Sequence, residues 1–457
     1  MHLTPQTSRR DLAVAIHAAA VAGVDPRAAT AMAVAARLPS PRPPYWVIGL
    51  GKASAAMTEA AVTALRVHGA EPEGGIVVGP QPAARPHPRV EIAVGDHPVP
   101  SARSWSAAAA VGDVVARIAG TGTTFVLLSG GATSLVAAPA AGVAERDLAS
   151  LFDALLGSGA DITVMNAIRK RFTRWGAGRL ARALAPSRVH CLMVSDVVGD
   201  DIPSIGSGPC APDPLDNADV LALIERDGLE PFVPRALREL LAGEASSFDA
   251  PPRRDDPVFR DVECQVILGN RAALGAGASA AAQLGASPLK VVAEPLDDDA
   301  TFTAQRIVDE LVRFREAGMA DENDEAPFGC MLWGGETTVR LGPGPAEPGG
   351  RCQELALAAA DALRAEGERG LGITLLAGGT DGRDGPTDAA GAVVDAHTWD
   401  AIRDAGRDPA QDLLEHRAYA ALDSVGALLR TGASGTNVGD VVVGIVERQP
   451  RRADLGS

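Results

Sequence analysis

The 457-residue sequence is short of aromatic residues, of paired cysteines and of long apolar runs. Aromatic residues make up 4% of the chain, so its core must be built from Ala, Val, Leu and Ile. The five cysteines form no CxxC pair and have no metal-ligand spacing, which is typical of free thiols in a reducing cytosol. No uninterrupted apolar run of about 18 residues occurs beyond the N-terminal segment. We therefore expect a soluble, cytoplasmic protein with no membrane partner.

The N-terminal segment itself resembles an export signal. Ser8-Arg9-Arg10 precedes the apolar run LAVAIHAAAVAGV. Asp11 directly after the arginines, His17 inside the run and the lack of a clear cleavage site argue against export. We expect an amphipathic first helix that ends near residues 23–26.

Several signatures of catalysis and binding are also missing. A net charge of −16 argues against nucleic-acid binding, although a few cations can still bind an anionic substrate. A Walker A motif would need Gly where Trp46 stands and Ser or Thr where Ala53 stands. Gly49-Leu50-Gly51 resembles a loose dinucleotide fingerprint, but the next strand, GGIVVGP, ends without the acid that binds a ribose. HExxH and GxSxG do not occur.

Apolar segments and helical segments alternate along the chain. Strand candidates lie at 45–50, 75–78, 90–94, 124–128 and 189–194, with helical stretches at 101–118, 145–156 and about 162–184. This order predicts a mostly parallel sheet covered on both faces. After a Pro- and charge-rich stretch at 213–260, a second series begins at 264–268 and continues at 289–293, 330–333, 373–377 and 441–446. We expect two Rossmann-like α/β domains with mostly parallel sheets, residues 1–245 and 246–457.

Polar residues gather where the strand at 189–194 ends. Ser195, Asp196, Asp200 and Asp201 are followed by the turn Ser204–Pro209, which includes Gly206, Ser207 and Gly208. Ligands of open α/β sheets bind beyond the carboxyl ends of the strands. Acidic groups there can hold Mg²⁺, and glycines expose N–H groups to a phosphate. The alternative is a surface turn, since Asp and Gly are common turn residues.

Three further strand ends carry paired glycines followed by Ser or Thr. The segments are VLLSGGATSL, MLWGGETTV and TLLAGGTDG. Paired glycines let the backbone approach a ligand closely and direct N–H groups at an anion. One such turn is weak evidence, but three together with residues 195–209 predict a polyanion site.

Two cations lie beside glycines at the expected starts of helices. Lys52 follows Gly51, and Arg351 follows Gly349-Gly350. A cation gains nothing from the helix dipole at this end, so each is unusual unless it helps to bind an anion. The alternatives are a surface lysine and a structural ion pair.

Other charged segments leave two interpretations open. Asp381, Asp384 and Asp388 bind a cation or form turns. The segment 166–171, NAIRKR, is an exposed basic helix face, which we favour, or an anion clamp.

Taken together, these motifs resemble the class II glycerate 2-kinases with a MOFRL-type C-terminal half. The resemblance rests on GLGKAS, LLSGGATSL, SGAD with NAIRK, SDVVGDDIPSIGSGPCAPDP, GGETTV, GGRCQELAL, GGTDGRDGPTDAAGA and GASGTNVGD, in order along nearly the whole chain. It implies ATP- and Mg²⁺-dependent phosphorylation of the 2-hydroxyl of D-glycerate to give 2-phosphoglycerate. It also implies an active site in the cleft between the two domains, with Lys52 and Arg351 as the key catalytic cations.

The expected site residues follow from that chemistry. Phosphoryl transfer is catalysed mainly by positioning and by electrostatic stabilisation. Lys52 and Arg351 would neutralise the phosphoryl group, and Asp196 or Asp381 would act as the base. Substrate would be bound by Lys52, Arg351 and Asp381. Mg²⁺ would be held by Asp196, Asp200 or Glu336. ATP phosphates would be bound by Gly51, Ser129, Gly130, Gly131, Ser134, Gly206, Ser207, Gly208, Gly334, Gly335, Thr380 and Asn437.

The sequence departs from the family pattern at Cys352, where the family usually has Asn, at Arg171-Phe172-Thr173 and at Gly176-Ala177-Gly178. The last two departures leave other acceptors open, such as an aldonate. An NAD(P)-dependent hydroxypyruvate reductase and a non-catalytic anion-binding module are the alternatives from other classes. The sequence does not fix the oligomeric state, and a homodimer stays open.

Overall fold

A computed structural model describes residues 8–38, 43–97, 99–118, 120, 122–243, 249–318, 326–340 and 348–448. The chain forms two compact units. We call Pro26–Leu268 the N-terminal unit, and Met1–Asp25 with Gly269–Ser457 the C-terminal unit. Each unit contains one sheet covered by helices, as the alternation of apolar and helical segments predicts.

The sheet of the N-terminal unit is parallel throughout its described strands, which confirms the prediction. Its order is β3-β2-β1-β4-β5-β6. Because all strands run the same way, their carboxyl ends meet at one edge. Their bounds are β1 Tyr45–Leu50, β2 Pro72–Gly79, β3 Val90–Val94, β4 Thr123–Leu128, β5 Arg188–Val194 and β6 Val262–Leu268.

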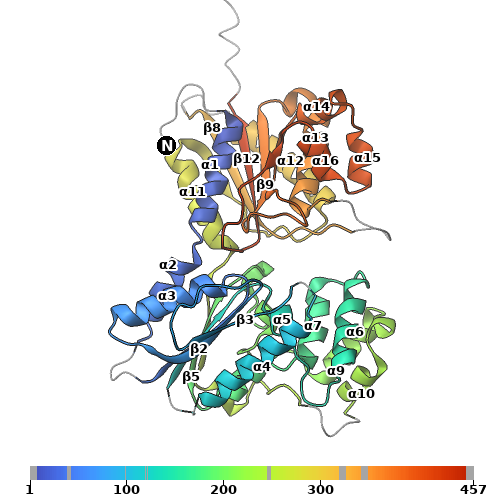
Figure 1. Cartoon of the computed structure of the whole chain (residues 1–457). Helices are drawn as coiled ribbons and strands as arrows, with labels where there is room; N and C mark the ends of the chain where they lie inside the picture. The colour runs from blue at the N-terminus through green and yellow to red at the C-terminus, as the bar shows by residue number, and fades with distance from the viewer. Residues whose placement is uncertain are drawn as a thin grey trace, which may run out of the picture. The chain divides into compact units, whose positions relative to one another are not determined.

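Two sets of helices belong to this unit. Helices α3 and α4 pack on the sheet, whereas α6, α7, α9 and α10 gather side by side and share a separate apolar core around Phe152 and Phe172 (Figure 1). The bounds are α2 Pro26–Ala35, α3 Ser54–Val67, α4 Ala102–Arg117, α5 Ala132–Leu135, α6 Glu145–Leu156, α7 Ile162–Phe172, α8 Arg179–Leu184, α9 Asn217–Arg226 and α10 Arg235–Leu241, with short turns η1 Val198–Asp200, η2 Ile205–Ser207, η3 Glu230–Phe232 and η4 Pro257–Phe259.

The expected helix at about 162–184 is two helices. Residues 173–178 separate α7 from α8, and within them Ala177 and Gly178 have φ of 53° and 80°. This left-handed backbone cannot continue a right-handed helix. The chain therefore turns at this point and brings the residue 173–178 loop to the 204–209 loop.

The sheet of the C-terminal unit is mixed, in contrast to the mostly parallel sheet predicted. Its order is β11-β10-β9-β12-β8-β7, and only β7 and β8 pair in parallel among the described strands. The cause is β12, which inserts antiparallel between β8 and β9. The bounds are β7 Ala286–Val291, β8 Phe328–Gly335, β9 Ile373–Gly379, β10 Gly391–Asp395, β11 Leu428–Leu429 and β12 Asp440–Glu447.

Helices cover both faces of this second sheet. Helices α1 and α11 pack together on one face, and α12 and α13 cover the other (Figure 1). The close approach of α1 to α11 depends on small residues, since a Cβ atom at Gly23 would lie 2.2 Å from the Ala276 Cβ. The bounds are α1 Arg9–Ala22, α11 Asn270–Gln283, α12 Ala300–Gly318, α13 Arg351–Ala365, α14 Thr398–Asp404, α15 Pro409–Leu414 and α16 Ala418–Asp423, with the turn η5 Gly367–Arg369.

The division between the units differs from the expected boundary at 245/246. The chain passes between them at 25/26 and at 268/269. The assignment of the strand at 264–268 to the second series was wrong, because β6 pairs with β5 in the first sheet. An apolar strand pattern does not reveal which sheet the strand joins, and the Pro-rich stretch before it lies within one unit.

By length and composition alone, Arg9–Ala35 is the one stretch among the described residues that could cross a membrane. In the structure it is two helices, α1 and α2. Helix α1 has a buried apolar face in the C-terminal unit, with Ala13, Ile16 and Ala20 fully buried. A core helix passes the same length and composition test, so burial in the fold accounts for the apolar residues of this stretch.

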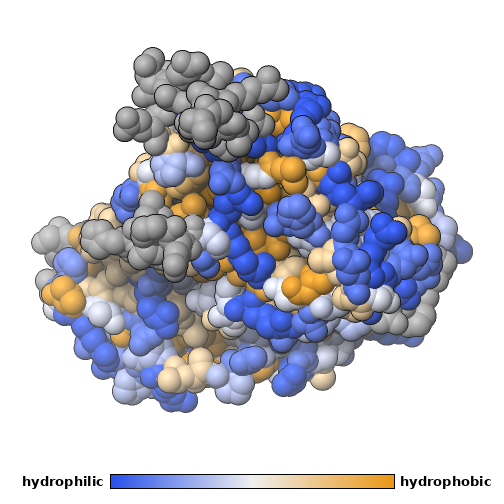
Figure 2. Space-filling model, turned by 90° about the horizontal axis from the view of Figure 1, so that it is seen from above, coloured by the Kyte–Doolittle hydropathy of each residue, from blue (hydrophilic) through white to orange (hydrophobic). Residues whose placement is uncertain are grey.

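The face of the protein drawn in Figure 2 is mainly polar. Figure 2 shows hydrophilic residues across the face seen from above, with hydrophobic residues in small groups between them. Large exposed hydrophobic residues come from separate elements, such as Val67 at the end of α3, Phe302 in α12 and Leu414 in α15. Scattered residues of this kind are normal on a protein surface.

Candidate active site

The carboxyl ends of β1 and β4 lie side by side and carry the first group of predicted site residues. The last residues of the two strands are in register. Beyond them, the Lys52 N–H donates to the Gly130 carbonyl over 2.9 Å, and the Ala53 N–H donates to Ser129 Oγ over 3.0 Å. The Lys52 backbone is therefore fixed against the Ser129–Gly131 turn, while the residue is exposed.

Two glycines of this turn region are required because other groups occupy the space of a side chain. A Cβ atom at Gly130 would lie 2.0 Å from Asp196 Oδ2, and one at Gly51, where φ is 122°, would lie 2.3 Å from Ser129 Oγ. Asp196 follows β5, the next strand in the sheet. The structure thus brings Lys52 and Asp196 to the same Ser129–Gly131 turn.

His97 belongs to this group, although the sequence analysis did not single it out. It follows β3, and a Cβ atom at Gly131 would lie 2.9 Å from His97 Cδ2 and 3.5 Å from Lys52 Cγ. Partial loss of water contact and the charge of Lys52 lower the pKa of His97 to about 4. The ring is therefore neutral near pH 7 and adds no charge beside Lys52. Its position after a strand end was the signal that could have found it.

The predicted phosphate turn at 206–208 packs against a neighbouring loop. Gly206, Ser207 and Gly208 have φ of 54°, 68° and 56°. The carbonyls of Ser207 and Gly208 accept the N–H groups of Ala177 and Gly178, each over 2.8 Å. Contact of this turn with a nucleotide therefore stays a prediction.

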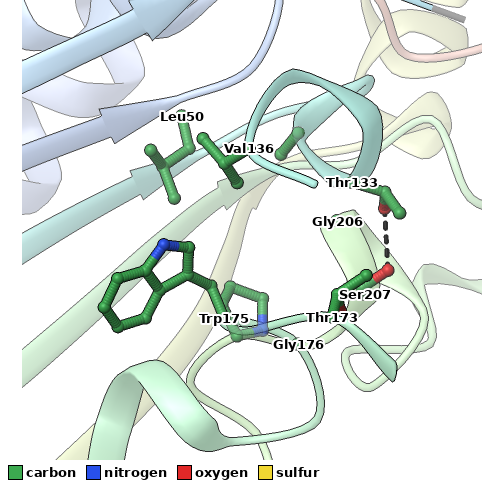
Figure 3. Close-up of a pocket in the computed structure, with 10 residues that line it drawn as sticks. Leu50, Thr133, Val136, Thr173, Trp175, Gly176, Gly206 and Ser207 are labelled. Carbon is green, nitrogen blue, oxygen red and sulfur yellow. Dashed lines mark hydrogen bonds between the residues drawn. The ribbon is translucent and has the colours of Figure 1, made fainter. Parts of the chain in front are cut away.

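A small cavity lies beside the same turn (Figure 3). Leu50, Val136 and Trp175 form its apolar wall, and Thr133 and Ser207 share a hydrogen bond of 2.8 Å between their hydroxyls. Its volume is about 10 Å³, which holds about one water molecule. The cavity is too small for a nucleotide.

Two other predicted residues of this unit have local roles. Ser134 is 5% exposed, and its hydroxyl donates to the Gly131 carbonyl over 3.3 Å, so it stabilises the turn. Asp200 lies in η1 with φ of 55°. Its role as a metal ligand stays a prediction.

The basic segment at the end of α7 is buried, so the exposed basic face that we favoured is wrong. Arg169, Lys170 and Arg171 are 6%, 4% and 3% exposed. Lys170 Nζ lies 2.9 Å from Asp213 Oδ1, and Arg171 Nε lies 3.3 Å from Asp213 Oδ2. Burial lowers the pKa of Arg169 to about 10. Lys170 and Arg171 hold the segment after the 204–209 turn through Asp213, whereas Arg169 donates to the Phe152 carbonyl. The departure from the family pattern at Arg171 lies in this structural contact.

The second group of predicted residues lies at one edge of the C-terminal sheet. Asp440, the first residue of β12, is in register with Gly335 at the end of β8 and with Gly379 at the end of β9. Arg351, the first residue of α13, binds Asp440 through two contacts, Nε to Oδ2 at 2.6 Å and Nη2 to Oδ1 at 3.0 Å. Its Nη1 lies 2.7 Å from Glu336 Oε1. Arg351 is thus one third exposed and paired with two carboxylates.

Asp384 caps helix α13. Its carboxylate accepts the N–H groups of Cys352 over 3.2 Å and of Gln353 over 2.8 Å. A Cβ atom at Gly350 would lie 2.2 Å from the Asp384 carboxyl carbon, which explains the glycine before Arg351. Burial and the charge of Asp440 raise the pKa of Asp384 to about 7, against the opposing effect of the two N–H groups and Arg351.

The other two aspartates of the same motif also make local contacts. Asp388 accepts the Tyr419 hydroxyl over 2.8 Å and Arg430 Nε over 3.1 Å. Asp381 Oδ1 accepts the Arg383 N–H over 3.0 Å, as in a turn. The structure therefore favours the turn interpretation for this motif, and the substrate role of Asp381 stays a prediction.

Thr380 and Asn437 stabilise the loop that leads to Asp440. Thr380 is fully buried, its hydroxyl donates to the Gly439 carbonyl over 2.6 Å, and it accepts the Val438 N–H over 2.9 Å. Asn437 Oδ1 accepts the Gly439 N–H over 3.3 Å. Both residues were expected to bind phosphate, and Thr380 is instead used inside the fold. Asp440 was missed by the sequence analysis, although it ends the motif GASGTNVGD.

Cys352 departs from the usual family residue and lies in the first turn of α13. It is 2% exposed. Burial and the charges of Asp440 and Asp384 raise the pKa of its thiol well above the ordinary value, so the thiol stays protonated. Among the described residues, no group of three or more His, Cys, Asp or Glu side chains is arranged to hold a metal.

The site residues therefore form two groups, one in each unit. The first contains Lys52, the Ser129–Gly131 turn and Asp196, and the second contains Glu336, Arg351 and Asp440 with their supporting loops. The cleft that the family resemblance implies stays a prediction.

Comparison with known proteins shows the family to which this chain belongs. The model of the Domain of unknown function (DUF4147) matches residues 12–242, and that of the MOFRL family matches residues 329–440. The D-glycerate 2-kinase of Thermotoga maritima is 35% identical over 88% of this chain and 90% of its own length. The chain belongs to the glycerate kinase family. It is accordingly a kinase, and the prediction from the motifs is confirmed.

Two further relatives match nearly the whole length of this chain. A crystal structure of glycerate kinase from Thermotoga maritima has a TM-score of 0.79 and 32% identity, covering 96% of this chain and 99% of that one. A protein of Agrobacterium vitis with the provisional name hydroxypyruvate reductase is 36% identical over 95% of this chain and 94% of its own length. The match to the glycerate kinase family thus includes both units.

Proposed function

We propose that the protein transfers a phosphoryl group from ATP to the 2-hydroxyl of D-glycerate and gives 2-phosphoglycerate. The observation that carries this proposal is the Lys52 backbone held on Gly130, with Asp196 against the same turn. A cation, backbone N–H groups and a carboxylate are what a phosphate with its counter-ion requires. Membership in the glycerate kinase family supports the acceptor.

The two cations would stabilise the transition state. Phosphoryl transfer passes through a loose, highly charged transition state, so catalysis depends on positioning and on electrostatic stabilisation. Lys52 is exposed and can reach a ligand, and the Arg351 guanidinium is 34% exposed while Asp440 holds it. We propose that Lys52 and Arg351 neutralise the transferred group and that Arg351 also binds the glycerate carboxylate.

The nucleotide would be bound mainly by the Ser129–Gly131 turn. Lys52 lies against this turn through its N–H on the Gly130 carbonyl, and Gly51 precedes it in the chain. Gly334, Gly335 and Asn437 at the second sheet, and the turn at 206–208, remain proposed contacts of ATP. Thr380 supports the second set from inside the fold.

The residues present fit a Mg²⁺ ion that arrives with the nucleotide. Mg²⁺ usually takes one or two carboxylates together with substrate phosphates, and Asp196 lies at the proposed phosphate turn. Asp196, Asp200 or Glu336 would hold it, and it would supply positive charge to the phosphate oxygens. Asp196 or Asp381 would accept the proton of the 2-hydroxyl.

The experiment is an assay of ADP release from purified protein with ATP, Mg²⁺ and D-glycerate. We expect release that stops after treatment with EDTA and returns with Mg²⁺, and a product with the ³¹P spectrum of 2-phosphoglycerate. Release of ADP with an aldonate but not with glycerate would mean that the aldonate, and not glycerate, is the acceptor. Full activity after EDTA treatment would remove the metal from the proposal.

Hydroxypyruvate reduction is the second candidate, since one relative carries that provisional name. The structure gives it less support, because β2 ends at Gly79 and is followed by Pro80, without an acidic residue to bind a ribose. Loss of NADH absorbance on addition of hydroxypyruvate, with no ADP release from ATP and glycerate, would favour the reductase.

A further inference from the structure

Arg351 is held by a series of contacts that begins at Asn270 in helix α11 and passes through Asp440. Asp440 engages it with both carboxylate oxygens, Oδ2 on Nε and Oδ1 on Nη2. A bidentate pair of this kind fixes the plane of the guanidinium as well as its position. The Asp440 side chain is 5% exposed, whereas Glu336, the other partner, is 40% exposed. Asp440 is therefore the partner buried within the fold, and it determines where Arg351 points.

Asp440 is itself placed by Asn270, the first residue of α11. Asn270 Nδ2 donates to the carbonyl of Asp440 over 2.8 Å and to the carbonyl of Val438 over 2.9 Å. One amide group thus binds the backbone on both sides of Gly439, which has φ of 83°. These two bonds fix the backbone where the loop enters β12.

One glycine of the site motifs leaves room for this amide. A Cβ atom at Gly334 would lie 1.7 Å from Asn270 Oδ1. Gly334 belongs to the paired glycines that we assigned to phosphate binding. Its close contact is instead with Asn270, so one glycine of that pair serves to place Asp440.

We propose that Asn270 and Asp440 are positioning residues that hold the Arg351 guanidinium in the orientation needed for phosphoryl transfer. The proposal rests on the proposed function. Neither residue acts on the substrate: Asn270 fixes the backbone of Asp440, and the Asp440 carboxylate fixes Arg351. Because a displacement of about 1 Å at a catalytic group can cost about 10²-fold in rate, loss of either contact lowers kcat more than it raises KM.

The test is a double-mutant cycle that includes Arg351. We expect Asp440→Asn to lower kcat about 10²-fold and Asn270→Ala about 10-fold in the wild-type protein. In the Arg351→Ala background neither change should lower the remaining activity further, because both act through the guanidinium. A full additional loss in that background would overturn the proposal.

Asp412→Asn is the matched control in the same unit. Asp412 is also a buried carboxylate with a bidentate arginine, Arg407 at 2.8 Å on each oxygen, and it binds Arg417 as well. It should lower the melting temperature as Asp440→Asn does and leave kcat unchanged. If Asn270→Ala fails to fold, Asn270→Ser, which keeps one donor, replaces it.

A second measurement does not depend on activity. The Nε–H resonance of Arg351 in ¹⁵N-arginine-labelled protein can be assigned by its loss in Arg351→Lys. We expect Asn270→Ala to shift or broaden it and Asp412→Asn to leave it unchanged. An unchanged resonance in Asn270→Ala would overturn the positioning role. If the resonance shifts in Asn270→Ala but the wild-type protein has no kinase activity, the contacts from Asn270 to Arg351 stand and the proposed function is refuted.

Discussion

The side chains of Lys52 and Arg351 differ in how the fold holds them. Lys52 is fixed through its backbone N–H on Gly130 and has an exposed side chain. Arg351 is fixed through its guanidinium, which contacts Asp440 and Glu336. A flexible cation can follow a moving phosphoryl group, and a fixed one can orient it. The proposed mechanism uses both properties.

Lys52→Ala tests the flexible cation. We expect kcat to fall about 10²–10³-fold with a smaller effect on ATP binding, because the charge acts mainly in the transition state. The control is Lys290→Ala, which removes an exposed lysine on β7. Steady-state kinetics with a circular dichroism spectrum to confirm folding are sufficient. Turnover near that of the wild-type protein would remove Lys52 from the site.

Asp384 gives a prediction about pH and stability. Its pKa is about 7 in the folded protein and near 3.8 when unfolded, so the folded state binds more protons between these values. Stability from this group is therefore full at low pH and falls as the pH rises from about 4 to about 7. Urea unfolding at pH 5 and pH 8 should show a smaller difference for Asp384→Asn than for the wild-type protein.

Asp388→Asn is the control for that measurement. Contacts with Tyr419 and Arg430 lower the pKa of Asp388, so its contribution is lost only at acidic pH. The difference between pH 5 and pH 8 should match that of the wild-type protein. Equal differences for both variants would mean that Asp384 does not titrate in this range.

The sequence could place the residues that follow strands and could not place those that support them. Lys52 and Arg351 stand beside glycines at the starts of helices, and Asp196 follows a strand end, which are signals that are local in the chain. Asp440 and Asn270 act through contacts with residues about 90 and 170 positions away, which no local pattern records. For Asp384 the sequence left cation binding and a turn open, because a helix cap formed by a distant loop has no sequence signature of its own.

At the scale of elements, strand ends decide where chemistry can occur. In the first sheet all strands are parallel, so β1, β4 and β5 deliver Lys52, Gly130 and Asp196 to one edge. In the second sheet β12 runs antiparallel between β8 and β9, so the start of β12 meets the ends of the other two. The antiparallel insertion was not predictable, because an apolar strand gives no sign of its direction.

Gly130→Ala tests the contact between the β4 turn and Asp196. The new methyl group would lie about where the Asp196 carboxylate is, 2.0 Å from Oδ2, and would displace it. We expect activity to fall at least about 10-fold and stability to fall by about 1–3 kcal/mol, as for an overpacked site. The control, Gly275→Ala in α11, adds a methyl group with no atom within 4 Å and should be neutral or stabilising. Unchanged kinetics in Gly130→Ala would contradict the role of Asp196.

At the scale of the whole molecule, the chain crosses between its units twice. Helix α1 belongs to the C-terminal unit, so the first crossing comes after this helix, at 25/26. The second crossing follows β6, at 268/269. The overall α/β class was predictable from alternating segments, since each apolar run needed a helix to cover it. The assignment of α1 and β6 to their units was not predictable, because it depends on packing against segments far away in sequence.

The division of site residues between two units gives the last prediction. Lys52 and Asp196 belong to one unit, and Glu336, Arg351 and Asp381 belong to the other. If phosphoryl transfer uses both groups, ATP and glycerate together must contact both. A ligand protects the backbone of the segments that it orders or contacts, because it stabilises the bound state relative to open states.

Hydrogen exchange with ATP, glycerate or both present measures this directly. With both ligands we expect slower exchange in two segments, residues 196–209 of the N-terminal unit and residues 349–354 of the C-terminal unit. The Lys52→Ala protein, with the same ligands, should keep the protection if Lys52 acts mainly in the transition state. Protection limited to one unit at saturating ligand would mean that a single unit contains the whole site, and the assignment of catalysis to both groups would then have to be abandoned.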